Sequence, residues 1–108
     1  MAEERGNEPA PEGAPASEGA VARKLVICNR KGLHARASAK FVQTVEKFDA
    51  DVRVTRGGET VGGTSIMGLM MLAAASGSAI SVEATGKQAA EVIDALSELI
   101  NSRFGEDD

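Results

Sequence analysis

Tryptophan and tyrosine are absent from this chain of 108 residues, and three phenylalanines are its only aromatic residues. The scarcity predicts a core of Val, Ile, Leu, Met and Ala, and the strand segments lack the aromatics on which an RNA-binding sheet stacks bases. The single cysteine, Cys28, excludes an internal disulfide and has no nearby Cys or His with which to share a metal. No apolar run could cross a bilayer, and the first residues lack the apolar stretch of a signal peptide. We therefore expect one small cytoplasmic domain without a metal, a membrane partner or a nucleic-acid partner.

Charge is distributed unevenly along the chain, although the formal net charge is only −4. Residues 1–22 carry 5 acids against 1 base, and residues 23–105 hold 8 acids and 11 bases. We expect a disordered acidic tail rich in Pro, Gly and Ala at 1–22, a folded domain over 23–105 and an acidic end at 106–108. Seven of the bases lie in one stretch around the only histidine. These bases either form an ordinary solvated face or create a positive field. Such a field would favour an anionic ligand or an acidic protein surface.

The pattern of apolar residues indicates short strands and helices in alternation. Four segments are typical of strands: residues 23–29, 51–55, 59–62 and 79–84. Three segments have helical spacing: residues 35–47, 66–72 and 89–100. The order β-α-β-β-α-β-α predicts an α+β fold, an open-faced β-sandwich in which three helices cover one face of a four-stranded, largely antiparallel sheet.

The stretch from Gly32 to Ser38 lies between the first strand and the first helix, so His34 is expected at a helix N-terminus. The first turn of a helix exposes unpaired N–H groups that can hold the oxygens of a phosphoryl group on the ring. Arg36 adds a cation able to fork onto phosphate oxygens. A nucleophile, an anion site and a cation thus converge, although a lone histidine at a helix start is more often a capping or surface residue.

Two motifs resemble those of the histidine-containing phosphocarrier (HPr) family of the bacterial phosphotransferase system. Gly32-Leu33-His34-Ala35-Arg36 matches its active-site signature, and the segment from Ser65 to Met70 is similar to its regulatory-serine segment. The resemblance covers residues 24–100 and implies that His34 accepts a phosphoryl group from enzyme I and passes it to enzyme IIA-type proteins, while Arg36 steadies the phosphohistidine. It also implies a stoichiometric carrier rather than an enzyme, and no cofactor.

The second motif implies regulation and docking. Ser65 would be the site of regulatory phosphorylation by an HPr kinase/phosphorylase, and without that modification it is a plain helix N-cap. Part of an apolar partner-binding patch would consist of Ile66, Met67 and Met70, of which we expect Met67 and Met70 to be exposed.

Departures from the family pattern leave alternatives open. Gln43 and Glu46 occupy positions where many sugar-transport members have Lys, which makes a regulatory protein of the nitrogen-related branch the main alternative. A module in which His34 is never phosphorylated is a further one. An acylphosphatase-like hydrolase shares the element order, but no Asn that could orient water follows Arg36 before Asn101.

Overall fold

The computed structural model describes residues 20–106. The tail expected at 1–22 and the acidic end expected at 106–108 lie largely outside these residues. The elements follow the expected order: β2 (Val21–Val26), α1 (Ala35–Val45), β3 (Asp51–Arg56), β4 (Glu59–Gly62), α2 (Ile66–Met71), β5 (Ala79–Thr85), α3 (Ala89–Asn101) and the short 3-10 helix η1 (Arg103–Gly105). Within residues 20–106, every helix is too short or too polar to span a membrane.

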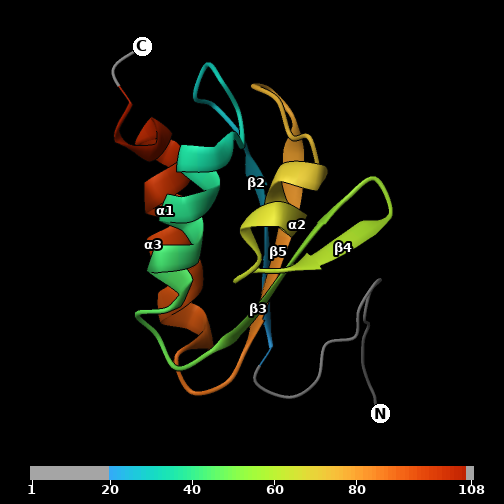
Figure 1. Cartoon of the computed structure of the whole chain (residues 1–108). Coiled ribbons are helices and arrows are strands. Elements are labelled where there is room, and N and C mark those ends of the chain that lie inside the picture. The colour runs from blue at the N-terminus through green and yellow to red at the C-terminus, as the bar shows by residue number, and fades with distance from the viewer. Residues whose placement is uncertain (1–19, 107–108) are drawn as a thin grey trace.

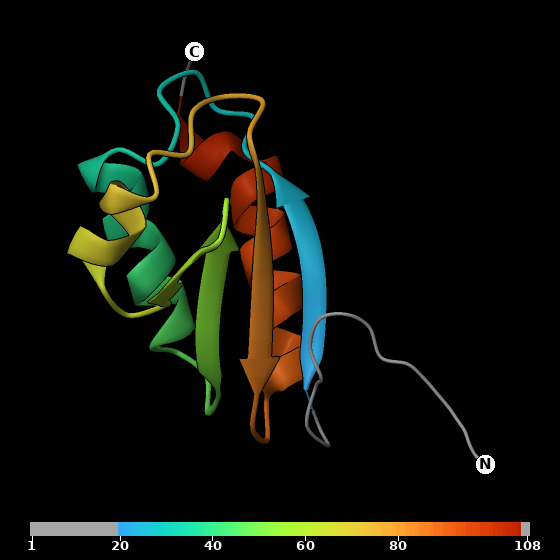
Figure 2. The same ribbon diagram turned by 90° about the vertical axis from the view of Figure 1, so that its right-hand side faces the viewer.

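The four strands form one sheet in the order β2-β5-β3-β4, and every neighbouring pair is antiparallel. The helices α1 and α3 pack against each other on one side of the sheet, and α2 packs against α1 and β4 (Figure 1). Figure 2 shows the sheet from its uncovered side, with α3 behind the strands. The predicted open-faced α+β sandwich is therefore confirmed.

The first strand begins earlier than its apolar run suggested. Its six residues pair with β5 from Val21 opposite Ala84 to Val26 opposite Ala79, so the strand includes two residues that the composition had assigned to the tail. Backbone pairing with β5 and the packing of Val21 against the core extend the strand there, ahead of the apolar run from Leu25 to Cys28. The strand ends at Val26 and not at Asn29 as predicted, although the backbone of Ile27 still hydrogen-bonds to Gly77 and Ser78 before the chain enters the loop that carries His34.

The core lies between the sheet and the helices. Alternate residues of β3 and β5 point into it, as their period of two predicts, and α1 contributes a buried stripe that includes Phe41 and Val45. The expectation of a purely aliphatic core is corrected in one respect, because Phe41 and Phe104 are among its largest fully buried side chains. Methionine contributes nothing to it, since the three methionines that the structure describes are all exposed.

Candidate functional site

The loop before α1 is held by close backbone packing at Gly32. This residue has a φ of +70°, and a Cβ there would lie 2.4 Å from the carbonyl oxygen of Ala74 and 2.9 Å from the Cα of Ala75. The next residue, Leu33, donates its N–H to the same Ala74 oxygen at 2.9 Å. Glycine is therefore required where the loop crosses the segment that follows α2.

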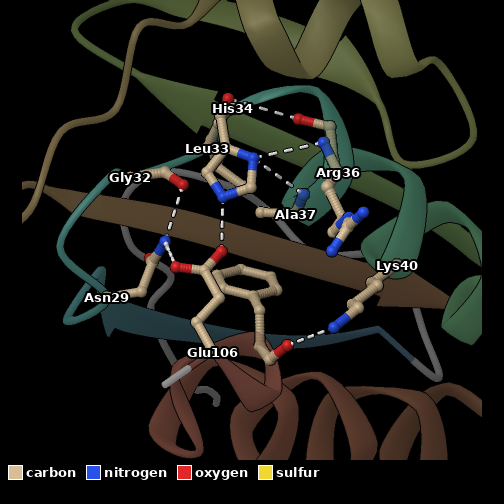
Figure 3. A network of polar contacts seen from close by, with 10 residues as sticks. Asn29, Gly32, Leu33, His34, Arg36, Ala37, Lys40 and Glu106 are labelled. Carbon is tan, nitrogen blue, oxygen red and sulfur yellow. Dashed lines mark hydrogen bonds and ion pairs between the residues drawn. The ribbon is translucent and has the colours of Figure 1, made fainter. Parts of the chain in front are cut away.

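His34 is the N-cap of α1, as predicted. Its Nδ1 accepts the backbone N–H groups of Arg36, at 3.2 Å, and of Ala37, at 3.4 Å (Figure 3). A ring nitrogen that accepts hydrogen bonds carries no proton, so the ring proton of the neutral histidine lies on Nε2. The lone pair of Nδ1 consequently faces the N-terminus of an eleven-residue helix.

A carboxylate from the far end of the chain contacts the other ring nitrogen. Glu106 follows η1, and its Oε2 forms a hydrogen bond with Nε2 of His34. Its Oε1 accepts a hydrogen bond from Nδ2 of Asn29 at 3.1 Å. Asn29 is fully buried and also donates Nδ2 to the carbonyl oxygen of Gly32 at 2.9 Å. Figure 3 shows these groups joined in one network around the ring.

This network determines the charge of Glu106. Partial burial alone would raise the pKa of the carboxyl group, but the hydrogen bonds from His34 and Asn29 and the electrostatic interactions with His34 and Lys31 outweigh it and lower the pKa below its usual value. The side chain is therefore a carboxylate at neutral pH. Sequence reasoning missed Asn29 and Glu106, since 77 residues separate them and Glu106 stands in an acidic end that has no motif.

An open pocket of about 870 Å³ surrounds the histidine. Its charged and titratable lining consists of His34, one acid and four bases: Arg30, Lys31, Arg36, Lys40 and Glu106. Lys40 also donates Nζ to the carbonyl oxygen of Phe104 at 2.5 Å, which ties α1 to η1. Four of the seven clustered bases thus line the pocket around His34, and Arg36 is among them as predicted.

The second motif lies on α2. Ser65 is exposed and caps this helix, because its Oγ accepts the N–H of Gly68 at 3.0 Å. Met67 and Met70 are exposed as expected, and Ile66 is 40% exposed as well. Met71, which the sequence analysis did not single out, is 71% exposed. We call these four exposed side chains, Ile66, Met67, Met70 and Met71, the apolar patch.

Comparisons with known proteins agree on one family. A family model described as "PTS HPr component phosphorylation site" matches residues 21–102. Phosphocarrier protein HPr of Neisseria meningitidis serogroup B is 52% identical over 84 residues, which cover 78% of this chain and 94% of that protein. Phosphocarrier protein NPr of Shewanella violacea is 34% identical over 84 residues, which cover 78% and 92%. The crystal structure of HPr-C-His from Thermoanaerobacter tengcongensis matches with a TM-score of 0.77 and 40% identity, over 81% of this chain and 98% of that one.

Proposed function

This chain belongs to the HPr family of phosphoryl carriers of the phosphotransferase system, and on that premise we propose that Nδ1 of His34 is the atom that carries the phosphoryl group. The observation that supports this most is the placement of Nδ1 at the N-terminus of α1, opposite the N–H groups of Arg36 and Ala37. Nε2 is engaged by Glu106 and is the poorer nucleophile.

The transfer follows from this geometry. The lone pair of Nδ1 attacks the phosphorus, the donor's bond to it breaks, and the electron pair of that bond stays with the donor. The phosphoryl oxygens then take over the backbone N–H groups that Nδ1 accepts in the free protein. Arg36 and Lys40, which line the same pocket, offset the charge of the phosphoryl group. Passing the group to an acceptor reverses the steps, so the chain acts stoichiometrically and not as an enzyme.

The proposed partners are enzyme I as donor and enzyme IIA-type proteins as acceptors, all in the cytoplasm. The apolar patch supports a common docking surface, because exposed methionine side chains adapt to several partners. The basic pocket beside it favours partners with acidic surfaces. Gln43 on α1 and Glu46 just after it are both exposed. Because many sugar-transport members have Lys at these positions, the enzyme I of the nitrogen-related branch is the alternative donor.

Ser65 is the proposed site of regulatory phosphorylation. Its hydroxyl lies at the N-terminus of α2, where a phosphate is electrostatically tolerated, and the side chain is exposed. A phosphate there would add a charge of about −2 next to Met67 and the rest of the apolar patch. An HPr kinase/phosphorylase would therefore weaken docking without touching His34.

Intact-mass measurement after incubation with phosphoenolpyruvate and enzyme I tests the proposal. The expected result is one acid-labile phosphate on the wild-type chain and none on His34→Ala. Arg36→Gln should accept the phosphate more slowly, whereas Arg53→Gln, which removes an exposed arginine on β3, should match the wild type. A folded wild-type chain that gains no phosphate from either the sugar or the nitrogen-related enzyme I would refute the role of His34.

A further inference from the structure

We propose that Glu106 is a positioning residue for phosphoryl transfer, whose carboxylate holds the Nε2–H of His34 and thereby keeps Nδ1 unprotonated and directed at the N-terminus of α1. The inference rests on the proposed role of His34 and assigns a function to the end of the chain beyond α3. No sequence motif marks that segment. The assignment rests on two sets of hydrogen bonds to the ring: Nε2 contacts the carboxylate, and Nδ1 accepts backbone N–H groups (Figure 3).

The carboxylate itself is fixed on several sides. Its Oε1 is held by the buried Asn29, which also holds the carbonyl oxygen of Gly32 in the loop that carries His34. One amide group therefore sets the distance between the loop and the carboxylate. The side chain of Glu106 is only 15% exposed, so water competes little for its oxygens.

The backbone before Glu106 is also shaped for this position. Arg103 and Phe104 adopt left-handed φ values of +59° and +56°, a conformation that costs free energy for residues other than glycine. The buried Phe104 ring anchors the turn, and Lys40 of α1 binds the Phe104 carbonyl oxygen. The N–H of Glu106 donates to the Arg103 oxygen at 2.9 Å and closes the turn. The chain is thus bent back from α3 onto the ring.

The carboxylate also matches the charge that develops during transfer. When Nδ1 forms its bond to phosphorus and the donor's bond breaks, the ring still holds its Nε2 proton and acquires one positive charge. A carboxylate hydrogen-bonded to that proton stabilises the charged ring, as orienting carboxylates do for other catalytic histidines. When the phosphoryl group leaves, the lone pair returns to Nδ1 and the ring becomes neutral again. The carboxylate therefore serves both halves of the cycle.

The tautomer of His34 can be read directly, because this chain contains a single histidine. Two-bond ¹H–¹⁵N correlation spectra distinguish a protonated from an unprotonated ring nitrogen. We expect the wild-type protein to show the proton on Nε2 alone at a pH where the ring is neutral. Glu106→Ala should show a mixture of both tautomers, and Glu106→Gln, which keeps an acceptor but loses the charge, should lie between them.

Phosphorylation rates with phosphoenolpyruvate and enzyme I form the second readout. Glu106→Ala is expected to slow phosphorylation about 10- to 100-fold, by analogy with the loss of a carboxylate that orients a metal-bound histidine, with a smaller loss in Glu106→Gln. Glu98→Ala is the matched control, because Glu98 is an exposed acid of α3 that lines a separate groove with Thr44 and Lys47. It should leave both tautomer and rate unchanged.

The outcomes separate this inference from the proposed function. If the wild-type chain is phosphorylated on His34 but Glu106→Ala keeps the wild-type tautomer and rate, the positioning role is wrong while the carrier role of His34 stands. A wild-type spectrum with the proton on Nδ1 would also overturn it. If the wild-type chain takes no phosphate, the proposed function itself fails, and the positioning role fails with it.

Discussion

Replacing Gly32 with alanine should destabilise the fold far more than the same replacement in an unobstructed turn. Gly32 and Gly57 both have left-handed φ values, +70° and +58°, so alanine is strained at either position. At Gly57 nothing lies within 4 Å of the added Cβ, whereas at Gly32 it would lie 2.4 Å from a backbone oxygen, that of Ala74. Comparing Gly32→Ala with Gly57→Ala therefore separates the free-energy cost of left-handed backbone strain from the cost of the steric clash at Gly32.

The magnitudes follow from these contacts. Left-handed backbone costs alanine about 1–2 kcal/mol, and the reduced freedom of the unfolded chain offsets roughly half of this, so Gly57→Ala should cost about 1 kcal/mol. Gly32→Ala must also move a backbone segment, at about 1–3 kcal/mol, and disturb the hydrogen bond from Leu33 to Ala74, worth about 1 kcal/mol. We expect Gly32→Ala to cost about 3 kcal/mol more than Gly57→Ala.

Urea denaturation followed by far-ultraviolet circular dichroism measures the difference, since the chain has no Trp or Tyr for intrinsic fluorescence of the usual kind. With an m-value of about 1–1.5 kcal/mol/M for a domain of this size, the midpoint of Gly32→Ala should lie about 2–3 M below that of Gly57→Ala. Equal losses of stability in the two variants would refute the argument that the loop carrying His34 is held by close packing at Gly32.

Three further predictions concern other contacts of the site and the patch. The lowered pKa of Glu106 means that its contacts stabilise the fold above the carboxyl pKa of the unfolded chain, about 4.3, and that this stability is lost as the pH falls through the lower pKa of the folded state. When the free energy of unfolding is measured from pH 7 down to pH 3, it should therefore fall less in Glu106→Gln than in the wild type. An equal fall in both proteins would contradict this. Ser65→Ala should cost about 1 kcal/mol in urea denaturation, because the N–H of Gly68 loses its cap; an unchanged midpoint would show that the cap is dispensable. Met67→Glu, at a position 71% exposed, should change stability by less than about 0.5 kcal/mol and yet slow transfer from enzyme I, and an unchanged rate would remove Met67 from the docking surface.

Local periodicity carried most of the fold prediction. A period of two identifies β3 and β5 because alternate side chains must face the covered side of the sheet, and the stripe on α1 follows from its 3.6-residue period. The predicted bounds were less accurate at β2, because its first residues are held by pairing with β5 and by the packing of Val21 against the core, which the local pattern does not show. In α2, six residues are too few for periodicity to separate the buried Leu69 from the exposed Met71.

The candidate site divides in the same way. His34 and Arg36 stand in one motif, and their position follows from a strand end and a helix start that are local in sequence. Glu106 and Asn29 come together only because α3 packs along β2 and the chain then bends back at Phe104. No spacing in a single sequence encodes that approach, so the carboxylate partner of the histidine emerges only from the three-dimensional arrangement.

The carrier role is tested most directly by following one labelled phosphoryl group through a full cycle. The chain is phosphorylated with ³²P-labelled phosphoenolpyruvate and enzyme I, separated from both, and mixed with an enzyme IIA domain. We predict that the label leaves His34 and appears on the IIA domain in equal amount, with none transferred from a His34→Ala sample. Label that stays on the chain, or that is released as inorganic phosphate in place of transfer, would contradict a carrier and favour a regulatory module or a hydrolase, respectively.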